Sequence, residues 1–129
     1  MLAEDDADDF YLFERAVEKA NAPFEVVWAK DAEEAMEYLQ TKTAQLPNVI
    51  VTDIKMPRKD GFDLLKWAHA NPTTSKIPCI VLSSSDEPQD KARAEALGAT
   101  AYHVKDSDTK AMAKMIAQIY QRFCADTQS

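Results

Sequence analysis

The sequence predicts an α/β fold: a doubly wound, five-stranded parallel sheet flanked by five helices. Segments with strand patterns and helix patterns alternate strictly along the 129 residues, which is typical of a parallel sheet with helical crossovers. The strand segments are apolar throughout instead of at every second residue, as expected for strands that are covered on both faces. A chain of this length with 46% hydrophobic residues can bury the core of one domain.

Five short apolar runs are predicted to be strands. The first, MLA, is brief, and the second, FEVVWA, is rich in β-branched and aromatic residues. VIVTD and IPCIVLS follow as continuous apolar runs, and TAYHV is the fifth strand. In chain order the predicted strands span residues 1–3, 24–29, 49–53, 77–83 and 100–104.

Five segments with apolar residues at helical spacing alternate with these strands. The second opens with Asp31 and has Glu34 three positions later, which is a capping-box pattern. Asn71-Pro72 ends the third, because the residue before a proline avoids helical geometry. Gly98 suits a left-handed terminator of the fourth. In chain order the predicted helices span residues 10–20, 31–40, 61–70, 86–98 and 108–124.

Composition and charge exclude several classes of function. A net charge of −7 argues against a nucleic-acid surface, which needs clustered Lys and Arg. No apolar run approaches the roughly 20 residues that span a bilayer, and the N-terminus lacks a signal-peptide pattern, so we expect a cytoplasmic protein without a membrane partner. Cys79 and Cys124 have no CxxC spacing and are expected to be free thiols. We expect one domain over 1–124 and a polar tail over 125–129.

Polar residues stand where four of the predicted strands end. Ligands of open parallel sheets gather beyond the carboxyl ends of the strands, so these side chains are expected to converge at one edge. They are Glu4, Asp5 and Asp6 after the first strand, Asp53 at the end of the third, Ser83 at the end of the fourth and Lys105 after the fifth.

This set of residues points to phosphoryl chemistry assisted by a metal. Neighbouring carboxylates repel one another, and a bound cation relieves the repulsion. Mg²⁺ prefers oxygen ligands and suits one or two carboxylates together with a phosphate. The chain has two glycines, neither of them in a glycine-rich phosphate loop. A phosphoryl group would therefore be held by the metal, Lys105 and Ser83, with Asp53 as the candidate nucleophile.

These motifs resemble the receiver domain of two-component response regulators, over essentially the whole chain. The family pattern places an acidic pair after the first strand, an acceptor Asp before Met-Pro-x-x-Asp-Gly, a Ser or Thr after the fourth strand and a Lys after the fifth. Here it reads EDD, DIKMPRKDG, VLSSS and YHVK. The resemblance implies a flavodoxin-like fold and a stand-alone receiver. It also implies a protein that is not an enzyme beyond its own phosphorylation and dephosphorylation.

The resemblance also implies how the phosphoryl group arrives. Asp53 would accept it from a sensor histidine kinase or a histidine phosphotransfer protein, in a reaction that depends on Mg²⁺. Glu4 and Asp5 form the acidic pair at the metal site. Asp5 and Asp53 are implied as Mg²⁺ ligands, together with the backbone carbonyl of Lys55.

The remaining implied roles concern binding of the phosphoryl group and output. Ser83 and Lys105 are implied to bind the phosphoryl group. Tyr102 is aligned with the switch aromatic and is implied to change rotamer when Ser83 moves toward the phosphate. The face made by the fourth helix, fifth strand and fifth helix, about 87–123, is commonly read by the downstream partner, which we expect to be a protein.

Two other functions remain open from the residues alone. A pseudo-receiver would dock partners without being phosphorylated. It is supported by Asp106, which follows Lys105 at a position where the family usually has a proline. This change leaves open where the lysine side chain lies and whether Asp106 pairs with it. A Mg²⁺-dependent phosphohydrolase of the haloacid-dehalogenase type would need a second Asp two residues after the first. Lys55 stands there, so a general acid is missing.

Other polar residues are interpreted as structural. Asp8 and Asp9 are interpreted as an acidic first helical turn, which the helix dipole favours. Asp60 and Gly61 are interpreted as turn residues without a chemical role.

Overall fold

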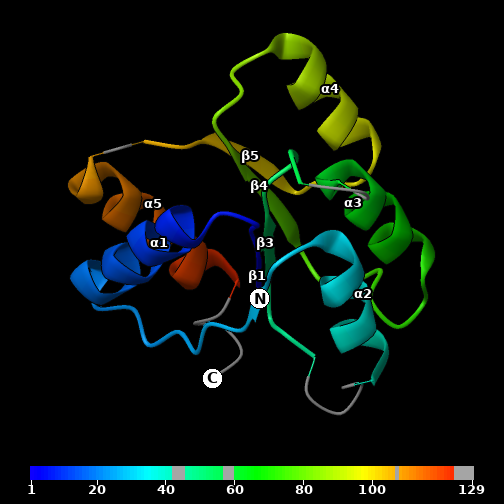
Figure 1. Ribbon diagram of the computed structural model, residues 1–129, viewed down its shortest axis with the longest axis horizontal. Coiled ribbons are helices and arrows are strands. Elements are labelled where there is room, and N and C mark those ends of the chain that lie inside the picture. Colours follow the sequence, from blue (N-terminus) through cyan, green and yellow to red (C-terminus); the bar gives the residue numbers. More distant parts are fainter. Residues whose placement is uncertain (42–45, 57–59, 107, 124–129) are drawn as a thin grey trace.

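A computed structural model describes residues 1–41, 46–56, 60–106 and 108–123. It contains one parallel sheet with the strand order β2-β1-β3-β4-β5, and Figure 1 shows helices on both of its faces. The predicted fold class is confirmed. The strands are β1 (Leu2–Ala3), β2 (Trp28–Ala29), β3 (Ile50–Thr52), β4 (Cys79–Ser83) and β5 (Ala101–Val104). The helices are α1 (Ala7–Ala20), α2 (Ala32–Thr41), α3 (Gly61–Ala70), α4 (Pro88–Ala96) and α5 (Thr109–Phe123).

The two shortest strands, β1 and β2, lie at one side of the sheet. β1 lies between β2 and β3, and Leu2 pairs with Trp28 on one side and Val51 on the other. The prediction of a strand over 24–29 was too long, because β1 offers β2 only two residues to pair with. The Leu2 N–H donates to Val27 O, and the residues before Val27 lie beyond the reach of β1.

Local capping sets where the helices begin. α1 starts three residues before the prediction, at Ala7, because the Asp6 carboxylate accepts from the Asp8 N–H at 2.8 Å and caps the helix there. Asp31 caps α2 as predicted and accepts from the Glu34 N–H at 2.7 Å. The Glu34 carboxylate reaches the N–H of Lys30, one residue before the cap.

The ends of two later helices are also set by specific residues. Asp60, interpreted as a turn residue, is the N-cap of α3, where it forms a reciprocal capping box with Asp63. Gly98 follows α4 with φ of +103°, which agrees with its prediction as a left-handed terminator.

The helices form two layers with separate apolar cores. Figure 1 shows α1 and α5 on one face of the sheet and α2, α3 and α4 on the other. Along β4, Ile80 and Leu82 pack in the core under α1 and α5, whereas Val81 packs in the core under α2 and α3. This alternation explains why the strand is apolar at every position, since both faces are covered.

Two sequence-based expectations concern cysteine and the membrane. Cys79 is buried in β4 as a free thiol, and burial raises its pKa to about 11. Cys124 and the tail over 125–129 lie outside the described residues. Within the described ranges, none of the helices combines the length and the apolar character needed to cross a bilayer.

Candidate functional site

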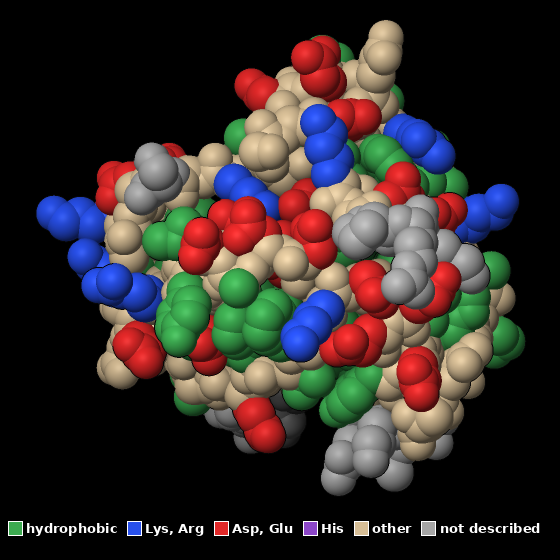
Figure 2. All heavy atoms as spheres, in the orientation of Figure 1, with side chains coloured by type: hydrophobic (Ala, Val, Ile, Leu, Met, Phe, Trp, Pro, Cys, Tyr) green, Lys and Arg blue, Asp and Glu red, His purple; other side chains and the backbone are tan. Residues whose placement is uncertain are grey.

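Residues from four segments meet at the carboxyl edge of the sheet. The hydrogen-bond ladder sets this arrangement: the Asp53 N–H donates to Ala3 O at 3.0 Å, directly before Glu4, and the Lys105 N–H donates to Ser83 O at 2.7 Å. In Figure 2, acidic side chains gather near the middle of this view, with a group of hydrophobic side chains beside them. The predicted convergence of Glu4, Asp53 and Lys105 at one edge is therefore seen in the structure.

The Lys105 ammonium is the centre of the cluster. Its Nζ lies 2.7 Å from Glu4 Oε1, 2.8 Å from Asp9 Oδ2 and 2.8 Å from Asp53 Oδ2. The described backbone contains no cis peptide bond, so Lys105-Asp106 is trans, and the amine still reaches Asp53. Asp106 accepts from the Asp108 N–H instead of pairing with this lysine. Both questions raised by the missing proline are answered.

The two oxygens of Asp53 have different partners. Oδ1 accepts from the backbone N–H of Ile54 at 2.7 Å and from that of Lys55 at 3.3 Å, whereas Oδ2 accepts from Lys105. The residue is 7% exposed. The backbone N–H groups fix the orientation of the carboxylate, so Oδ2 is directed at the ammonium.

Gly61 lies against the backbone of Asp53. A Cβ at this position would lie 2.0 Å from the Asp53 carbonyl oxygen and 2.8 Å from Ile54 Cα. The Gly61 N–H also donates to Ile54 O at 3.1 Å, which ties the start of α3 to the end of β3. Gly61 therefore has a role that its interpretation as a turn residue missed: it allows α3 to approach the segment that carries Asp53.

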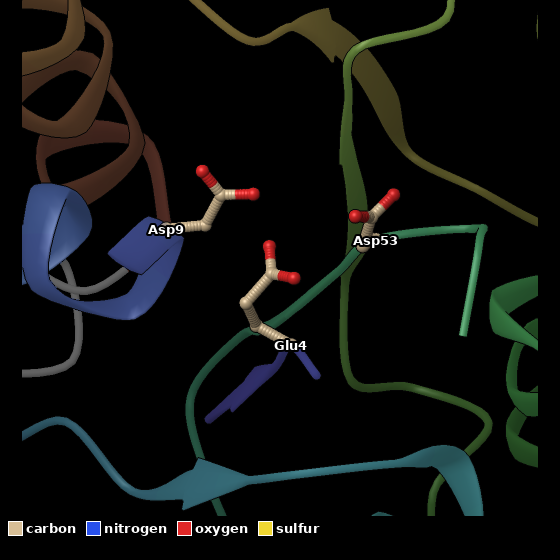
Figure 3. Close-up of side chains that lie close together, drawn as sticks. All are labelled: Glu4, Asp9 and Asp53. Atoms are coloured by element: carbon tan, nitrogen blue, oxygen red, sulfur yellow. The ribbon is translucent and has the colours of Figure 1, made fainter. Parts of the chain in front are cut away.

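Three carboxylates share one ammonium, and the pKa values of Glu4 and Lys105 are shifted in this cluster. Oxygens of Glu4, Asp9 and Asp53 lie within 4.8 Å of one another, and Figure 3 shows these side chains arriving from three different segments. Burial, with a further contribution from the Asp53 charge, raises the pKa of Glu4 to about 7 despite the nearby ammonium. For Lys105, burial acts to lower the pKa, but hydrogen bonds to Asp53, Asp9 and Glu4 outweigh it and leave the pKa above its ordinary value.

The donor chemistry of this cluster fits a hard divalent cation. Carboxylate oxygens are the ligands that Mg²⁺ and Mn²⁺ prefer, and Glu4 and Asp53 are both buried residues of the cluster. Burial raises the pKa of Glu4, and a bound cation would favour the charged form of this carboxylate. The residues present thus suit the metal that the sequence predicts.

Two acidic residues differ from their expected positions. Asp9, interpreted as part of an acidic helical turn, contributes to the cluster and pairs with Lys105. The sequence signal was its spacing of three residues from the Asp6 cap, which places it in the first turn of α1. Asp5 is exposed and is not among the three carboxylates of the cluster found in the described residues. It lines an adjoining open cavity with Ile54 and Lys55.

Ser83 and Tyr102 are joined through one residue. Ser83 is fully buried, and its Oγ accepts from the Ser85 N–H at 3.1 Å. The Tyr102 hydroxyl donates to the Ser85 carbonyl at 2.8 Å. The Ser85 hydroxyl donates to Asp90 on α4 at 2.5 Å and accepts from the N–H of Glu87, the N-cap of that helix. Ser85, hereafter the Ser85 junction, thus bonds to β4, β5 and α4.

Comparison with known sequences identifies relatives. A family model described as the response regulator receiver domain matches residues 1–117. Response regulator Rcp1 of Synechocystis sp. is 28% identical over 123 residues, which cover 92% of this chain and 84% of that protein. The gliding motility regulatory protein of Myxococcus xanthus is 44% identical over 77 residues, or 60% of this chain and 10% of that protein. Response regulator protein GraR of Staphylococcus epidermidis is 30% identical over 122 residues, or 95% of this chain and 51% of that protein.

The chain therefore spans about a tenth of the gliding motility protein and about half of GraR.

Among solved structures, the phosphorylated cyanobacterial phytochrome response regulator RcpA matches with a TM-score of 0.86 at 29% identity, over 97% of this chain and 92% of that one. The Mn²⁺-bound form of response regulator Rcp1 matches with a TM-score of 0.82 at 27% identity, over 96% of this chain and 93% of that one. Because the family model matches residues 1–117 of this chain, the chain belongs to the family of response regulator receiver domains.

Proposed function

We propose that Asp53 accepts a phosphoryl group from a phosphohistidine donor and that the phosphorylated domain signals to a protein partner. The observation that carries the proposal is the 2.8 Å contact between Asp53 Oδ2 and Lys105 Nζ, inside a cluster of buried oxygen ligands. In the transfer, a carboxylate oxygen of Asp53 forms a bond to phosphorus as the bond from phosphorus to the histidine nitrogen breaks. The histidine nitrogen leaves with the electron pair of that bond.

The residues around Asp53 have separate parts in this reaction. The N–H groups of Ile54 and Lys55 hold Oδ1 and orient the nucleophile. Lys105, already within reach of Asp53, neutralises charge on the transferred phosphoryl oxygens. The buried Ser83 hydroxyl donates to one of those oxygens.

Mg²⁺ would be held by carboxylates of Glu4 and Asp53 in the cluster, together with Asp5 and the Lys55 carbonyl beside the adjoining cavity. When bound, such an ion supplies positive charge that lets an anionic phosphoryl group approach a carboxylate. The relative Rcp1 has a Mn²⁺-bound form, which supports a divalent-cation site in this chain but does not identify its ligands.

Two surfaces are proposed for partners. Tyr11 and Leu12 on α1 are 64% and 44% exposed, close in sequence to Asp9 of the cluster, and suit a sensor histidine kinase or histidine phosphotransfer protein that must bring its histidine to Asp53. The face from 87 to 123 is the proposed surface for the downstream protein. It includes α4, whose first turn bonds to the Ser85 junction.

The alternative functions are less well supported. The pseudo-receiver interpretation rested on uncertain placement of Lys105, and its Nζ contacts Asp53 directly. The phosphohydrolase interpretation still lacks a general acid, since Lys55 stands at the position that a second Asp would need.

Intact-mass measurement after incubation with acetyl phosphate and Mg²⁺ tests the proposal. We expect the wild type to gain the mass of one phosphoryl group, and Asp53→Asn to gain none. Asp86→Asn is the matched control, because Asp86 is an exposed acid that pairs with Lys91 and is not one of the three clustered carboxylates, and it should gain the group like the wild type. A wild type without a mass gain would contradict the proposal.

A further inference from the structure

The side chain of Trp28 holds the backbone of Glu4. Its indole Nε1–H donates to the Glu4 carbonyl oxygen at 2.7 Å. The Glu4 N–H donates to Ala29 O at 2.9 Å, so both backbone polar groups of Glu4 bond to the β2 segment. β2 ends at Ala29, and the next bond of a parallel ladder would require a further backbone N–H from this strand. The indole supplies that bond.

The ring of Trp28 also contacts the segment that follows the acids. It stacks on Phe10, with ring centroids 4.1 Å apart and the planes 5° from parallel. Lys30 Nζ also lies over the Trp28 ring, 5.6 Å from its centroid. Phe10 directly follows Asp9 in the first turns of α1. One side chain therefore contacts both chain segments that bring Glu4 and Asp9 to the cluster.

We infer that Trp28 is a positioning residue of the acidic cluster, which fixes the carboxylates of Glu4 and Asp9 relative to Asp53. This inference rests on the proposed function, in which the cluster contributes to a Mg²⁺ site. β1 has only two residues, so the ladder alone gives the following segment little support. Groups that orient a metal ligand through its own backbone or side chain matter almost as much as the ligand, and their loss typically weakens metal binding by about 10–100-fold.

Trp28→Phe tests the inference, because phenylalanine keeps a ring to stack on Phe10 and loses the N–H that bonds to Glu4. Mg²⁺ binding can be followed by NMR through the amide of Ile54, whose N–H donates to Asp53 Oδ1. We expect the Kd for Mg²⁺ to rise about tenfold in this variant. Trp67→Phe is the matched control. Trp67 lies on α3 and packs in the core of the other layer, so its Kd should stay within about twofold of the wild type.

A Kd in Trp28→Phe equal to that of the wild type would overturn the inference and leave the proposed function intact. A wild-type protein whose Ile54 amide does not respond to Mg²⁺ would overturn the proposed function and the inference with it. The two failures are therefore distinguishable within one titration series.

A second measurement does not require Trp28→Phe to fold. In Trp67→Phe, Trp28 is the single remaining tryptophan, so its indole N–H resonance is unambiguous. We expect this resonance to shift during the Mg²⁺ titration and to saturate at the same concentration as the Ile54 amide. An indole resonance that stays fixed while Ile54 responds would overturn the inference.

Discussion

Replacing Gly61 with alanine should damage the site without touching any of its polar groups. The added Cβ would lie 2.0 Å from the Asp53 carbonyl oxygen and 2.8 Å from Ile54 Cα, whereas ordinary van der Waals contacts of a Cβ begin near 3.4 Å. Both neighbours are backbone atoms, so they cannot rotate away. Either α3 or the Asp53 segment must move by more than about 1 Å, and the bond from the Gly61 N–H to Ile54 O ties the two together.

The size of the effect follows from this displacement. Inserting a methyl group into a tightly packed place costs about 1–3 kcal/mol, and we expect a loss of about 3 kcal/mol because the clash is with backbone. A displacement of about 1 Å at a reacting group can cost about 100-fold in rate. Urea unfolding measures the first quantity, and the rate of phosphorylation by acetyl phosphate with Mg²⁺ measures the second.

Gly98→Ala is the matched control. Gly98 has φ of +103°, and its added Cβ would meet the His69 side chain at 2.7 Å, which can rotate away. The left-handed conformation costs a non-glycine residue about 1–2 kcal/mol, so stability should fall while the phosphorylation rate stays near that of the wild type. The reasoning would be refuted if Gly61→Ala were as stable and as fast as the wild type, or if both variants slowed equally.

Three further predictions concern charge and hydrogen bonds. Lys105→Met leaves three carboxylates without their ammonium and should lower the free energy of unfolding at pH 7 by about 3 kcal/mol; equal stability in urea would contradict the assigned ion pairs. The pKa of Glu4 is raised from 4.5 to about 7 in the fold, so the folded state holds this proton more tightly than the unfolded state. Without divalent cations, the free energy of unfolding should therefore fall as pH rises from about 4.5 to about 7, by up to about 3 kcal/mol. Glu4→Gln should flatten this part of the plot of urea-unfolding free energy against pH. An unchanged slope in the variant would show that another group is responsible. Ser85→Ala removes the hydroxyl that bonds to Asp90 and to the Glu87 N–H. It should destabilise the start of α4 by about 1 kcal/mol. Amide exchange at the start of α4 should then be faster than in the wild type, whereas exchange in α3 should be unchanged.

The sequence was sufficient for the fold and for the main residues of the cluster, for a geometric reason. Parallel strands end at the same edge, so Asp53 after β3 and Lys105 after β5 could be placed together without knowing any side-chain torsion. The pairing of Asp9 with Lys105 could not be predicted in this way. It depends on α1 starting at Ala7, which the Asp6 cap decides, and helix boundaries are the least predictable feature of a sequence.

The role of Trp28 lay beyond the sequence for a similar reason. FEVVWA indicated a strand, and an aromatic residue in a strand is usually a packing residue. The indole bonds to Glu4 because β2 ends at Ala29, and that end depends on how few residues β1 offers. Asp106 was a competitor for Lys105 by proximity in sequence. Its carboxylate instead bonds to the Asp108 N–H, a local choice that charge counting does not reveal.

The Ser85 junction has an implication for how relatives of this domain can diverge. Its link to Ser83 and its link to Tyr102 use the backbone N–H and carbonyl, which every residue except proline provides. Its links to α4 use the hydroxyl, which substitution can remove. A single substitution of Ser85 can therefore remove the hydrogen bonds to α4. The hydrogen bond from Tyr102 remains, because it uses the backbone carbonyl. The contact with α4 can therefore differ between relatives, whereas the contact with Tyr102 is kept by any residue that provides a backbone carbonyl.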